Sequence, residues 1–263
     1  MNEAKRIASR DNATFKALRA LSAEPHRHGR TLVDGIHLVA TCRARGHPVR
    51  QLLASESGLR QAEVAALFAD ADGIERLVLR DALFREVSGV LTPTGIAAVI
   101  EIPPEPAGAI EGDALLLDAV QDAGNVGAML RTAAAAGLRN VLLGPGCAGA
   151  WTPRVLRGGQ GAHFSLAIRE KVDLGEVLAT ARATAVATVA RGGIDLYRAD
   201  LRGPTWWLVG NEGAGLSAAL VEAAALRVTI PLAGGTESLN VAAATAVCLF
   251  EARRQRSAPL AAG

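Results

Sequence analysis

Residues 114–137 read ALLLDAVQDAGNVGAMLRTAAAAG, and this stretch decides the fold of the C-terminal half. It begins with an apolar run that stops at Asp118 and has the length of a buried strand. A helix is expected from about Asn125 to Gly137, because Asn125 can cap free backbone N–H groups and glycine commonly ends a helix. The stretch therefore predicts a strand, a polar loop and a helix in succession.

The same alternation continues towards the C-terminus. Helical patterns cover 172–183, 216–225 and 238–256. Strands that are buried in a parallel sheet have continuous apolar sequences, and four such runs follow: NVLLG, TAVATVA, TWWLVG and LRVTIPL, at 140–144, 184–190, 205–210 and 226–232. The C-terminal half is therefore predicted to be an α/β domain with a parallel sheet. Within it, Trp206 and Trp207 alternate on a strand, so one is expected in the core and the other at an interface.

Three polar loops follow strands in this half, within 118–137, 206–217 and 230–246. Open α/β sheets bind ligands at the carboxyl ends of their strands. The candidate side chains are Asn125 and Arg131 in the first loop, Glu212 in the second, and Ser238 and Asn240 in the third. Taken singly, each of them is explained equally well as a surface charge, a turn residue or a helix cap.

The second loop also allows a different interpretation. Gly213, Gly215 and Ala218 fit the GxGxxA pattern of a dinucleotide-binding turn, with Ser217 placed to cap the next helix. Only about 45 residues follow, and the next strand ends without the acidic residue that would bind a ribose. The dinucleotide interpretation is therefore weak. A phosphate-binding P-loop fails as well, because no Gly-Lys-Ser or Gly-Lys-Thr follows a glycine run.

The N-terminal half has the pattern of a smaller α/β unit. Residues 5–22 are predicted to form an amphipathic helix with Ile7, Phe15, Leu18 and Leu21 on its apolar face. Short apolar runs and helical patterns alternate after it, and a segment rich in proline and glycine follows at 102–113. The predicted division is an N-terminal domain at 1–102 with a basic helical arm at 1–30, a linker at 103–113, and a C-terminal domain at 114–263.

Composition and charge narrow the class of protein. The 263 residues are half hydrophobic, but the apolar runs are shorter than the roughly 20 residues of a membrane span. The charged N-terminus lacks the anatomy of a secretory signal, so a cytoplasmic location is expected. The three cysteines show no CxxC spacing and are expected to be core thiols, with no metal site. Residues 1–50 carry a net charge of +6 against −4 for the rest, which suits a polyanion or, as an alternative, a solvated arm.

Read in order, NVGAMLRTA, LVGNEGAGLS and IPLAGGTESLNVAAATA resemble the motifs of the SpoU/TrmH-type RNA ribose 2′-O-methyltransferases of the SPOUT superfamily. Upstream, LVDGIHLVATCRARGHPVRQLLAS and TPTGIAAVIEI resemble the ribosomal-protein-like substrate-binding domain that often precedes this catalytic domain. Members restricted to tRNA commonly lack that domain, so the resemblance favours ribosomal RNA of the 23S type. A tRNA 2′-O-methyltransferase and a non-catalytic RNA-binding or ribosome-associated protein with the same fold are the alternatives.

The resemblance implies S-adenosylmethionine as cofactor, a deep trefoil knot in the parallel-sheet domain, a homodimer, and RNA as partner, with neither DNA nor membrane expected. Carried over by position, the cofactor site comprises Leu208, Gly210, Ile230, Leu232 and Leu239. The implied catalytic set is Arg131, Asn125, Glu212, Ser238 and Asn240. The RNA-binding set is Asn125 and Arg157, together with the basic residues Lys5, Arg10, Lys16 and Arg30.

A ribose 2′-hydroxyl is a poor nucleophile until it loses its proton, so the reaction requires a base or a charge-stabilising group beside it. Arg131 matches the family's candidate, but arginine normally stays protonated. We therefore expect Arg131 to orient the ribose and stabilise charge, or to act as a base only where a neighbouring group lowers its proton affinity. Three positions depart from the family pattern: Ala123 replaces a proline, Asp34 replaces a glutamate, and Gly158-Gly159 replace Ala-Ser, which removes any serine contact there.

Overall fold

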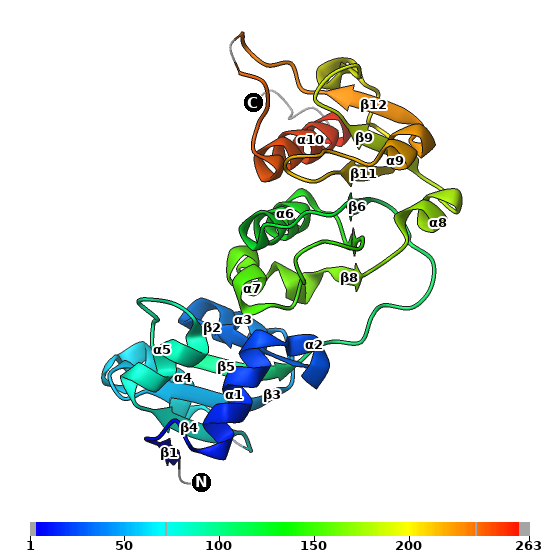
Figure 1. The fold of residues 1–263 in the computed structure, drawn as a ribbon. Coiled ribbons are helices and arrows are strands. Elements are labelled where there is room, and N and C mark those ends of the chain that lie inside the picture. The colour runs from blue at the N-terminus through cyan, green and yellow to red at the C-terminus, as the bar shows by residue number, and fades with distance from the viewer. Residues whose placement is uncertain (1–3, 72, 235, 258–263) are drawn as a thin grey trace, which may run out of the picture. The chain divides into compact units, whose positions relative to one another are not determined.

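The protein is described from a computed structural model, which places residues 4–71, 73–234 and 236–257. The chain forms two compact units (Figure 1). Unit 1 comprises residues up to Pro104 together with Trp151–Phe164, and unit 2 comprises Glu105–Ala150 and the residues from Ser165 onward. The predicted domains differ from these units in two segments: Trp151–Phe164, predicted within the catalytic domain, belongs to unit 1, and residues 105–113 of the predicted linker belong to unit 2. Within the placed residues, no helix has the length and apolar character to cross a membrane.

Unit 1 is built on a five-stranded sheet, as far as the structure describes it, with the order β1-β4-β3-β5-β2. Strand β5 is antiparallel to β2 and β3, and the other pairs are parallel. The strands are β1 (Lys5–Ile7), β2 (Arg30–Asp34), β3 (Val49–Ser55), β4 (Glu75–Leu79) and β5 (Ile96–Glu101). The helices are α1 (Ala13–Ala23), α2 (Pro25–His28), α3 (Ile36–Ala44), α4 (Ala62–Ala69), α5 (Asp81–Ser88) and α7 (Pro153–Gly159), with a short 3-10 turn at Gly58–Arg60.

The N-terminal segment differs from the predicted single helix over 5–22. Lys5–Ile7 forms the edge strand β1, and α1 begins only at Ala13. The physical reason is Asn12, whose side chain accepts hydrogen bonds from the backbone N–H groups of Thr14 (2.9 Å) and Phe15 (3.3 Å) and so starts the helix there. The predicted apolar residues are all buried, but Ile7 reaches the core from a strand.

Unit 2 contains a parallel sheet whose described strands number seven, in the order β10-β12-β9-β11-β6-β7-β8. The strands are β6 (Ala114–Leu117), β7 (Asn140–Leu143), β8 (Ala167–Glu170), β9 (Thr184–Thr188), β10 (Ile194–Asp195), β11 (Thr205–Val209) and β12 (Leu226–Thr229). The helices are α6 (Ala123–Ala136), α8 (Leu174–Ala179), α9 (Ala218–Ala223) and α10 (Val241–Arg256), and Leu196–Arg198 forms a 3-10 turn. The parallel sheet expected from the apolar runs is confirmed.

The strand order brings β6 and β11 side by side in the middle of this sheet, although about ninety residues separate them in sequence. Their central position explains their composition, since all residues of both strands are buried. Trp206 and Trp207 are only 2% and 1% exposed, so the expectation that one of them lies at an interface is wrong for this chain. The indole N–H of Trp206 donates to the Gly112 carbonyl (3.0 Å) at the edge where the strands begin.

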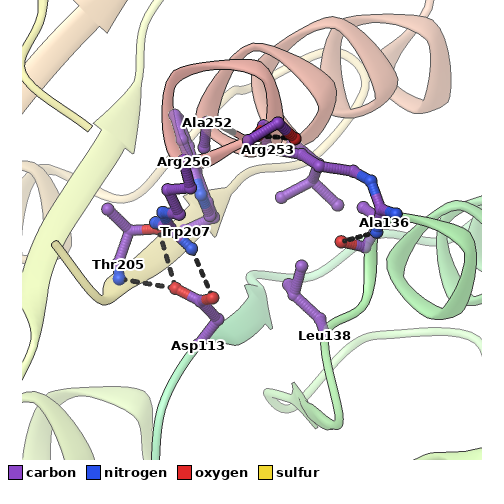
Figure 2. A pocket seen from close by; sticks show the side chains of 10 residues that line it. Asp113, Ala136, Leu138, Thr205, Trp207, Ala252, Arg253 and Arg256 are labelled. Atoms are coloured by element: carbon purple, nitrogen blue, oxygen red, sulfur yellow. Dashed lines mark hydrogen bonds and ion pairs between the residues drawn. The ribbon is translucent and has the colours of Figure 1, made fainter. Parts of the chain in front are cut away.

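Helices α6 and α10 pack against each other. The Thr245 hydroxyl lies 3.2 Å from the sulfur of Met129, and Arg253 donates to the Ala136 carbonyl (3.1 Å) at the end of α6 (Figure 2). Gly137 follows α6 with φ +93°, which is the left-handed stop expected from the sequence. Because α6 follows β6 and α10 is the last helix, this packing brings the two helix starts to the carboxyl edge of the sheet.

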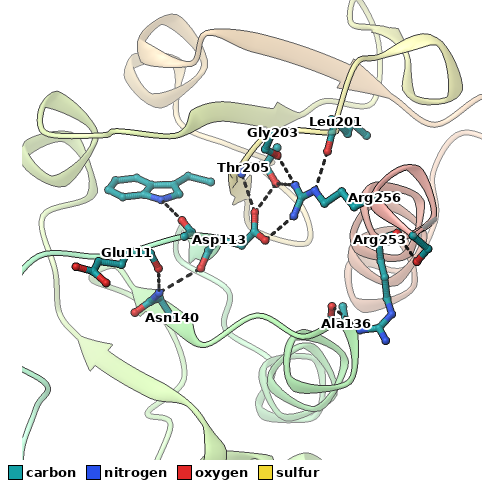
Figure 3. Close-up of polar contacts among 12 residues, drawn as sticks. Glu111, Asp113, Ala136, Asn140, Leu201, Gly203, Thr205, Arg253 and Arg256 are labelled. Carbon is teal, nitrogen blue, oxygen red and sulfur yellow. Dashed lines mark hydrogen bonds and ion pairs between the residues drawn. The ribbon is translucent and has the colours of Figure 1, made fainter.

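A polar clamp holds the opposite edge, where the strands begin (Figure 3). Arg256, in the last turn of α10, binds Asp113 (2.5 Å) just before β6. The same guanidinium donates to the carbonyls of Leu201 (2.9 Å) and Gly203 (2.7 Å) and to the Thr205 hydroxyl (2.9 Å). Asp113 also accepts from the Thr205 backbone N–H (2.7 Å), so the clamp joins the C-terminal helix, β6 and β11.

Candidate active site

Two loops meet at the carboxyl ends of β6 and β11. The backbone N–H of Asp118 donates to the Val209 carbonyl (2.8 Å), and the Asp118 carboxylate accepts from the Ser217 N–H (2.9 Å). The side-chain amide of Asn211 donates to the carbonyl of Ala119 (2.8 Å), a residue with a left-handed φ of +53°. The loops after the two strands are therefore fastened to each other by backbone and side-chain bonds.

Three of the predicted catalytic residues come together at this junction. The Asn125 side-chain N–H donates to Oε1 of Glu212 (3.1 Å), and the Asn125 oxygen accepts from the side-chain N–H of Asn240 (3.0 Å). Asn240 caps α10, since its oxygen accepts from the N–H groups of Ala242 (2.9 Å) and Ala243 (3.2 Å). Each of the three loops identified in the sequence thus contributes one residue to a single network.

The capping role predicted for Asn125 is wrong. Helix α6 begins at Ala123, and Asp122 is its cap, with the carboxylate accepting from the Asn125 N–H (2.8 Å). Asn125 therefore lies inside the first turn, and its side chain is available for the network. Ala123 occupies the first helical position, where proline is well tolerated, which accounts for the proline common there in the family. At α9, Ser217 holds the cap position, but within the placed chain its side chain makes no cap bond.

Glu212 is oriented by the first loop. Besides the bond from Asn125, its carboxylate accepts from the backbone N–H groups of Gln121 (3.3 Å) and Asp122 (3.2 Å). Partial burial would raise the pKa of Glu212, but these hydrogen bonds lower it further than burial raises it, so the pKa lies below its ordinary value. Glu212 is therefore a carboxylate at neutral pH and accepts hydrogen bonds rather than supplying a proton.

A cavity of about 580 Å³ lies beside this network, within the size range of small-molecule sites. Leu232 and Leu239 are 37% and 41% exposed, although apolar side chains of this size are usually buried. Five further predicted residues line the cavity: Gly210, Glu212, Ile230, Ser238 and Asn240. Lining residues that the sequence argument missed include Thr188, Asn211 and Cys248.

Leu208 was predicted to be an apolar wall of the cofactor site. Its side chain instead lies fully buried in the core cluster of the sheet, and the next residue, Val209, lines the cavity. The reason is the alternation of side chains along a strand, which turns neighbouring residues to opposite faces. The Leu208 carbonyl still takes part in holding this edge together, because it accepts from the hydroxyl of Thr188 (2.9 Å).

The glycines of the second loop are required by its backbone. A Cβ on Gly210 would lie 2.1 Å from both the Gly215 carbonyl carbon and the Leu216 nitrogen, so only glycine fits there. Gly215 has φ +71°, a conformation that favours glycine. Reciprocal backbone bonds of 3.0 Å between Asn211 and Gly215 close the turn.

Arg131 lies apart from the network. It is exposed on α6, and among the residues that the structure places it has no hydrogen-bond or ion-pair partner. The structure thus brings Asn125, Glu212 and Asn240 together, lines the cavity with Ser238, and leaves Arg131 on the outer surface of its helix. Its catalytic role stays a prediction.

The residues predicted to bind RNA lie in unit 1, apart from Asn125. Lys5 donates to the Thr14 hydroxyl (3.4 Å), Lys16 lies 3.5 Å from Asp11, and Arg30 is exposed. The guanidinium of Arg10 is paired with the Glu86 carboxylate, which partly neutralises its charge. These basic residues belong to β1, α1 and β2 or the turns between them, so the segment is part of the folded unit rather than a free arm.

Arg157, on α7, lies 3.9 Å from the carboxylate of Asp34. Asp34 is buried and also accepts a hydrogen bond from the Ser88 hydroxyl. Burial raises the pKa of Asp34, while Ser88 and Arg157 oppose that rise. Arg157 is therefore tied to the sheet of unit 1, and its predicted contact with RNA stays a prediction.

The placed residues contain no cluster of three or more histidine, cysteine, aspartate or glutamate side chains that could hold a metal ion. Cys42 and Cys248 are buried, and Cys147 is partly buried. Burial raises the pKa of the Cys248 thiol to about 12, so this lining residue is a neutral thiol.

Comparison with known proteins gives two family matches. Residues 114–250 match the model of the SpoU rRNA methylase family, and residues 12–98 match the model of the MRM3-like substrate-binding domain. A 23S rRNA guanosine 2′-O-methyltransferase of Bacillus subtilis is 34% identical over 253 residues, which cover 95% of this chain and 99% of that protein.

Solved structures agree with these matches. The SpoU methyltransferase AviRb of Streptomyces viridochromogenes, in complex with S-adenosylmethionine, superposes with a TM-score of 0.83 at 30% identity, covering 93% of this chain and 98% of that one. An rRNA methyltransferase of Sinorhizobium meliloti with the same cofactor bound gives a TM-score of 0.82 at 28% identity, covering 98% of this chain and 100% of that one. On these matches, the chain belongs to the SpoU rRNA methylase family, preceded by a substrate-binding domain of the MRM3-like type.

Proposed function

We propose that this protein transfers a methyl group from S-adenosylmethionine to a ribose 2′-hydroxyl of 23S-type ribosomal RNA. The observation that carries the proposal is the bonded network of Asn125, Glu212 and Asn240 beside a ligand-sized cavity. Relatives that align with nearly the whole chain are named as 23S rRNA 2′-O-methyltransferases. A tRNA substrate is the second candidate, and DNA is not expected as a partner.

The residues around the cavity fit the proposed cofactor. Adenine needs a flat apolar slot with a few backbone hydrogen bonds, and Leu232 and Leu239 offer exposed apolar surface that a ring would cover. The tight turn at Gly210 places backbone groups at the cavity wall. When bound, S-adenosylmethionine supplies the methyl group as an electrophile.

The network of Asn125, Glu212 and Asn240 can position a ribose, and in this role the Glu212 carboxylate does not have to remove the proton of the 2′-hydroxyl. Glu212 fixes the amide orientation of Asn125, and Asn240 occupies the Asn125 oxygen. The remaining N–H of Asn125 can then donate to a phosphate or ribose oxygen of the RNA. The guanidinium of Arg131 would stabilise the negative charge that develops on the 2′-oxygen as the hydroxyl proton passes to water.

The homodimer belongs to the same proposal. Arg131 lies outside the cavity network of its own chain, and Phe250 on α10 is 46% exposed, with Ala135 of α6 and Ala243 of α10 also exposed. Exposed apolar and small side chains on two packed helices suit a second copy of the chain. We also propose that the parallel-sheet domain contains the deep trefoil knot that the resemblance of its loop motifs implies, and that the protein is cytoplasmic.

An assay of methyl transfer tests the function. The purified protein with labelled S-adenosylmethionine is expected to label unmodified 23S rRNA at a single ribose and to leave tRNA unlabelled. Mapping of methylated riboses in cells that lack the protein should show one missing 2′-O-methyl group in ribosomal RNA. Labelling of tRNA alone would show that tRNA, and not 23S rRNA, is the substrate. The absence of labelling on any RNA would favour a non-catalytic RNA-binding protein.

A further inference from the structure

Asn211 occupies the centre of the junction between the two loops. Its oxygen accepts hydrogen bonds from the N–H groups of Gly213 (2.9 Å) and Ala214 (3.0 Å), which shape its own turn. Its N–H group reaches across to the carbonyl of Ala119 (2.8 Å) in the other loop. One side chain therefore holds both loops at once.

The loop that Asn211 reaches has an unfavourable backbone. Ala119 has φ +53°, a left-handed conformation that strains a residue other than glycine and persists where its surroundings hold it. The two residues after Val120 are Gln121 and Asp122, whose N–H groups donate to Glu212. The conformation at Ala119 thus sets where those donors lie relative to the carboxylate.

We propose that Asn211 is a positioning residue for methyl transfer, because it fastens the Ala119 loop to the Gly213–Ala214 turn and so holds Glu212 against its partners. The role rests on the function proposed above and adds a residue to it. Asn211 acts through Glu212, and Glu212 in turn fixes the amide of Asn125. Asp118 supports the same junction from the other side through Ser217.

The test uses Asn211→Asp, which keeps the oxygen that accepts from Gly213 and Ala214 but replaces the N–H donor with a second oxygen. The matched control is Asn140→Asp, because Asn140 also donates to two backbone carbonyls, those of Glu111 (2.8 Å) and Asp113 (3.2 Å), at the opposite edge of the sheet (Figure 3). Asn211→Leu has a side chain of similar size without charge. It shows whether an effect comes from losing the bond to the Ala119 carbonyl or from adding a carboxylate.

We expect kcat/KM for 23S rRNA to fall at least about tenfold in Asn211→Asp and Asn211→Leu, since small displacements of positioning groups have large effects on rate. Asn140→Asp should keep the wild-type kcat/KM. Combining Asn211→Asp with Glu212→Gln should cost little more than one change alone, because both act on one network. Adding Ala119→Gly should restore part of the activity of Asn211→Asp, since glycine adopts the left-handed conformation without strain.

Hydrogen exchange gives a measurement that does not depend on activity. In Asn211→Asp, amide exchange should accelerate in 118–122 as well as in 210–215, whereas Asn140→Asp should leave both segments unchanged. Acceleration confined to 210–215, wild-type kcat/KM in Asn211→Leu, or multiplicative effects with Glu212→Gln would overturn the role of Asn211. Absence of methyl transfer by the wild-type protein would instead refute the proposed function.

Discussion

At the residue scale, a substitution of Arg131 distinguishes a catalytic role of this residue from that of a surface charge on a helix. Arg131 is exposed on α6, so Arg131→Lys should change the free energy of unfolding by only a few tenths of a kcal/mol, because both residues are good helix formers. As a catalytic group, lysine lacks the planar fork that can hold a ribose oxygen and a second oxygen together. Turnover of rRNA should then fall at least about a hundredfold, or roughly 2.7 kcal/mol. Steady-state kinetics and a thermal melt of the variant measure both; wild-type turnover would remove Arg131 from the mechanism.

Glu212 gives a second residue-scale prediction, on pH. The pKa of Glu212 is lower in the folded protein than its usual value. Its hydrogen bonds therefore contribute stability above the unfolded pKa of about 4.3, and that contribution is lost as the pH falls through the lower folded pKa. Wild type should be more stable than Glu212→Gln at pH 7, and the difference should shrink towards pH 3 in urea unfolding. A difference that stays constant over this range would contradict the assigned bonds.

At the scale of the element, the end of α10 depends on Arg256. Its side chain is 25% exposed, and it binds Asp113, Thr205 and two backbone carbonyls. Arg256→Ala should lower the free energy of unfolding by roughly 2–3 kcal/mol, because it leaves Asp113 without its charged partner. Urea unfolding measures this loss. Arg202→Ala is the control, since the Arg202–Asp200 pair is 74% and 64% exposed and should contribute little to the free energy of unfolding.

Segment Trp151–Phe164 lies within the C-terminal half of the sequence but packs with the N-terminal residues of unit 1. The Thr31 hydroxyl donates to the Trp151 carbonyl (2.6 Å), and Arg157 faces buried Asp34, so this segment depends on strand β2. Removing residues 1–104 should therefore leave Trp151–Phe164 without its packing partners. Limited proteolysis should cut the shortened chain within this segment, while the full chain resists there. Equal protection in both chains would show that the segment orders itself without unit 1.

For the whole molecule, RNA affinity should depend on unit 1, because residues 1–50 carry the net charge of +6 and neutralisation of phosphates dominates such binding. The shortened chain should keep the cavity residues and bind S-adenosylhomocysteine, but lose most of its affinity for rRNA. Filter binding at several salt concentrations should also give a shallower salt dependence. An unchanged affinity and salt slope would place the RNA contacts in unit 2.

The sequence by itself determined the features that local chemistry controls. Apolar runs predicted the parallel sheet, Gly137 predicted the end of α6, and the three loop motifs identified Asn125, Glu212 and Asn240. Residue type and spacing along the chain were enough for these predictions, because they determine which strands are buried and where the loops begin. Tertiary structure decided which partners those loops meet. The pairing of β6 with β11 makes Asn211 a bridge to Ala119, and the bond from Thr31 to the Trp151 carbonyl ties the segment Trp151–Phe164 to unit 1. These two contacts join residues 92 and 120 positions apart, and periodicity along the chain does not encode contacts at that separation.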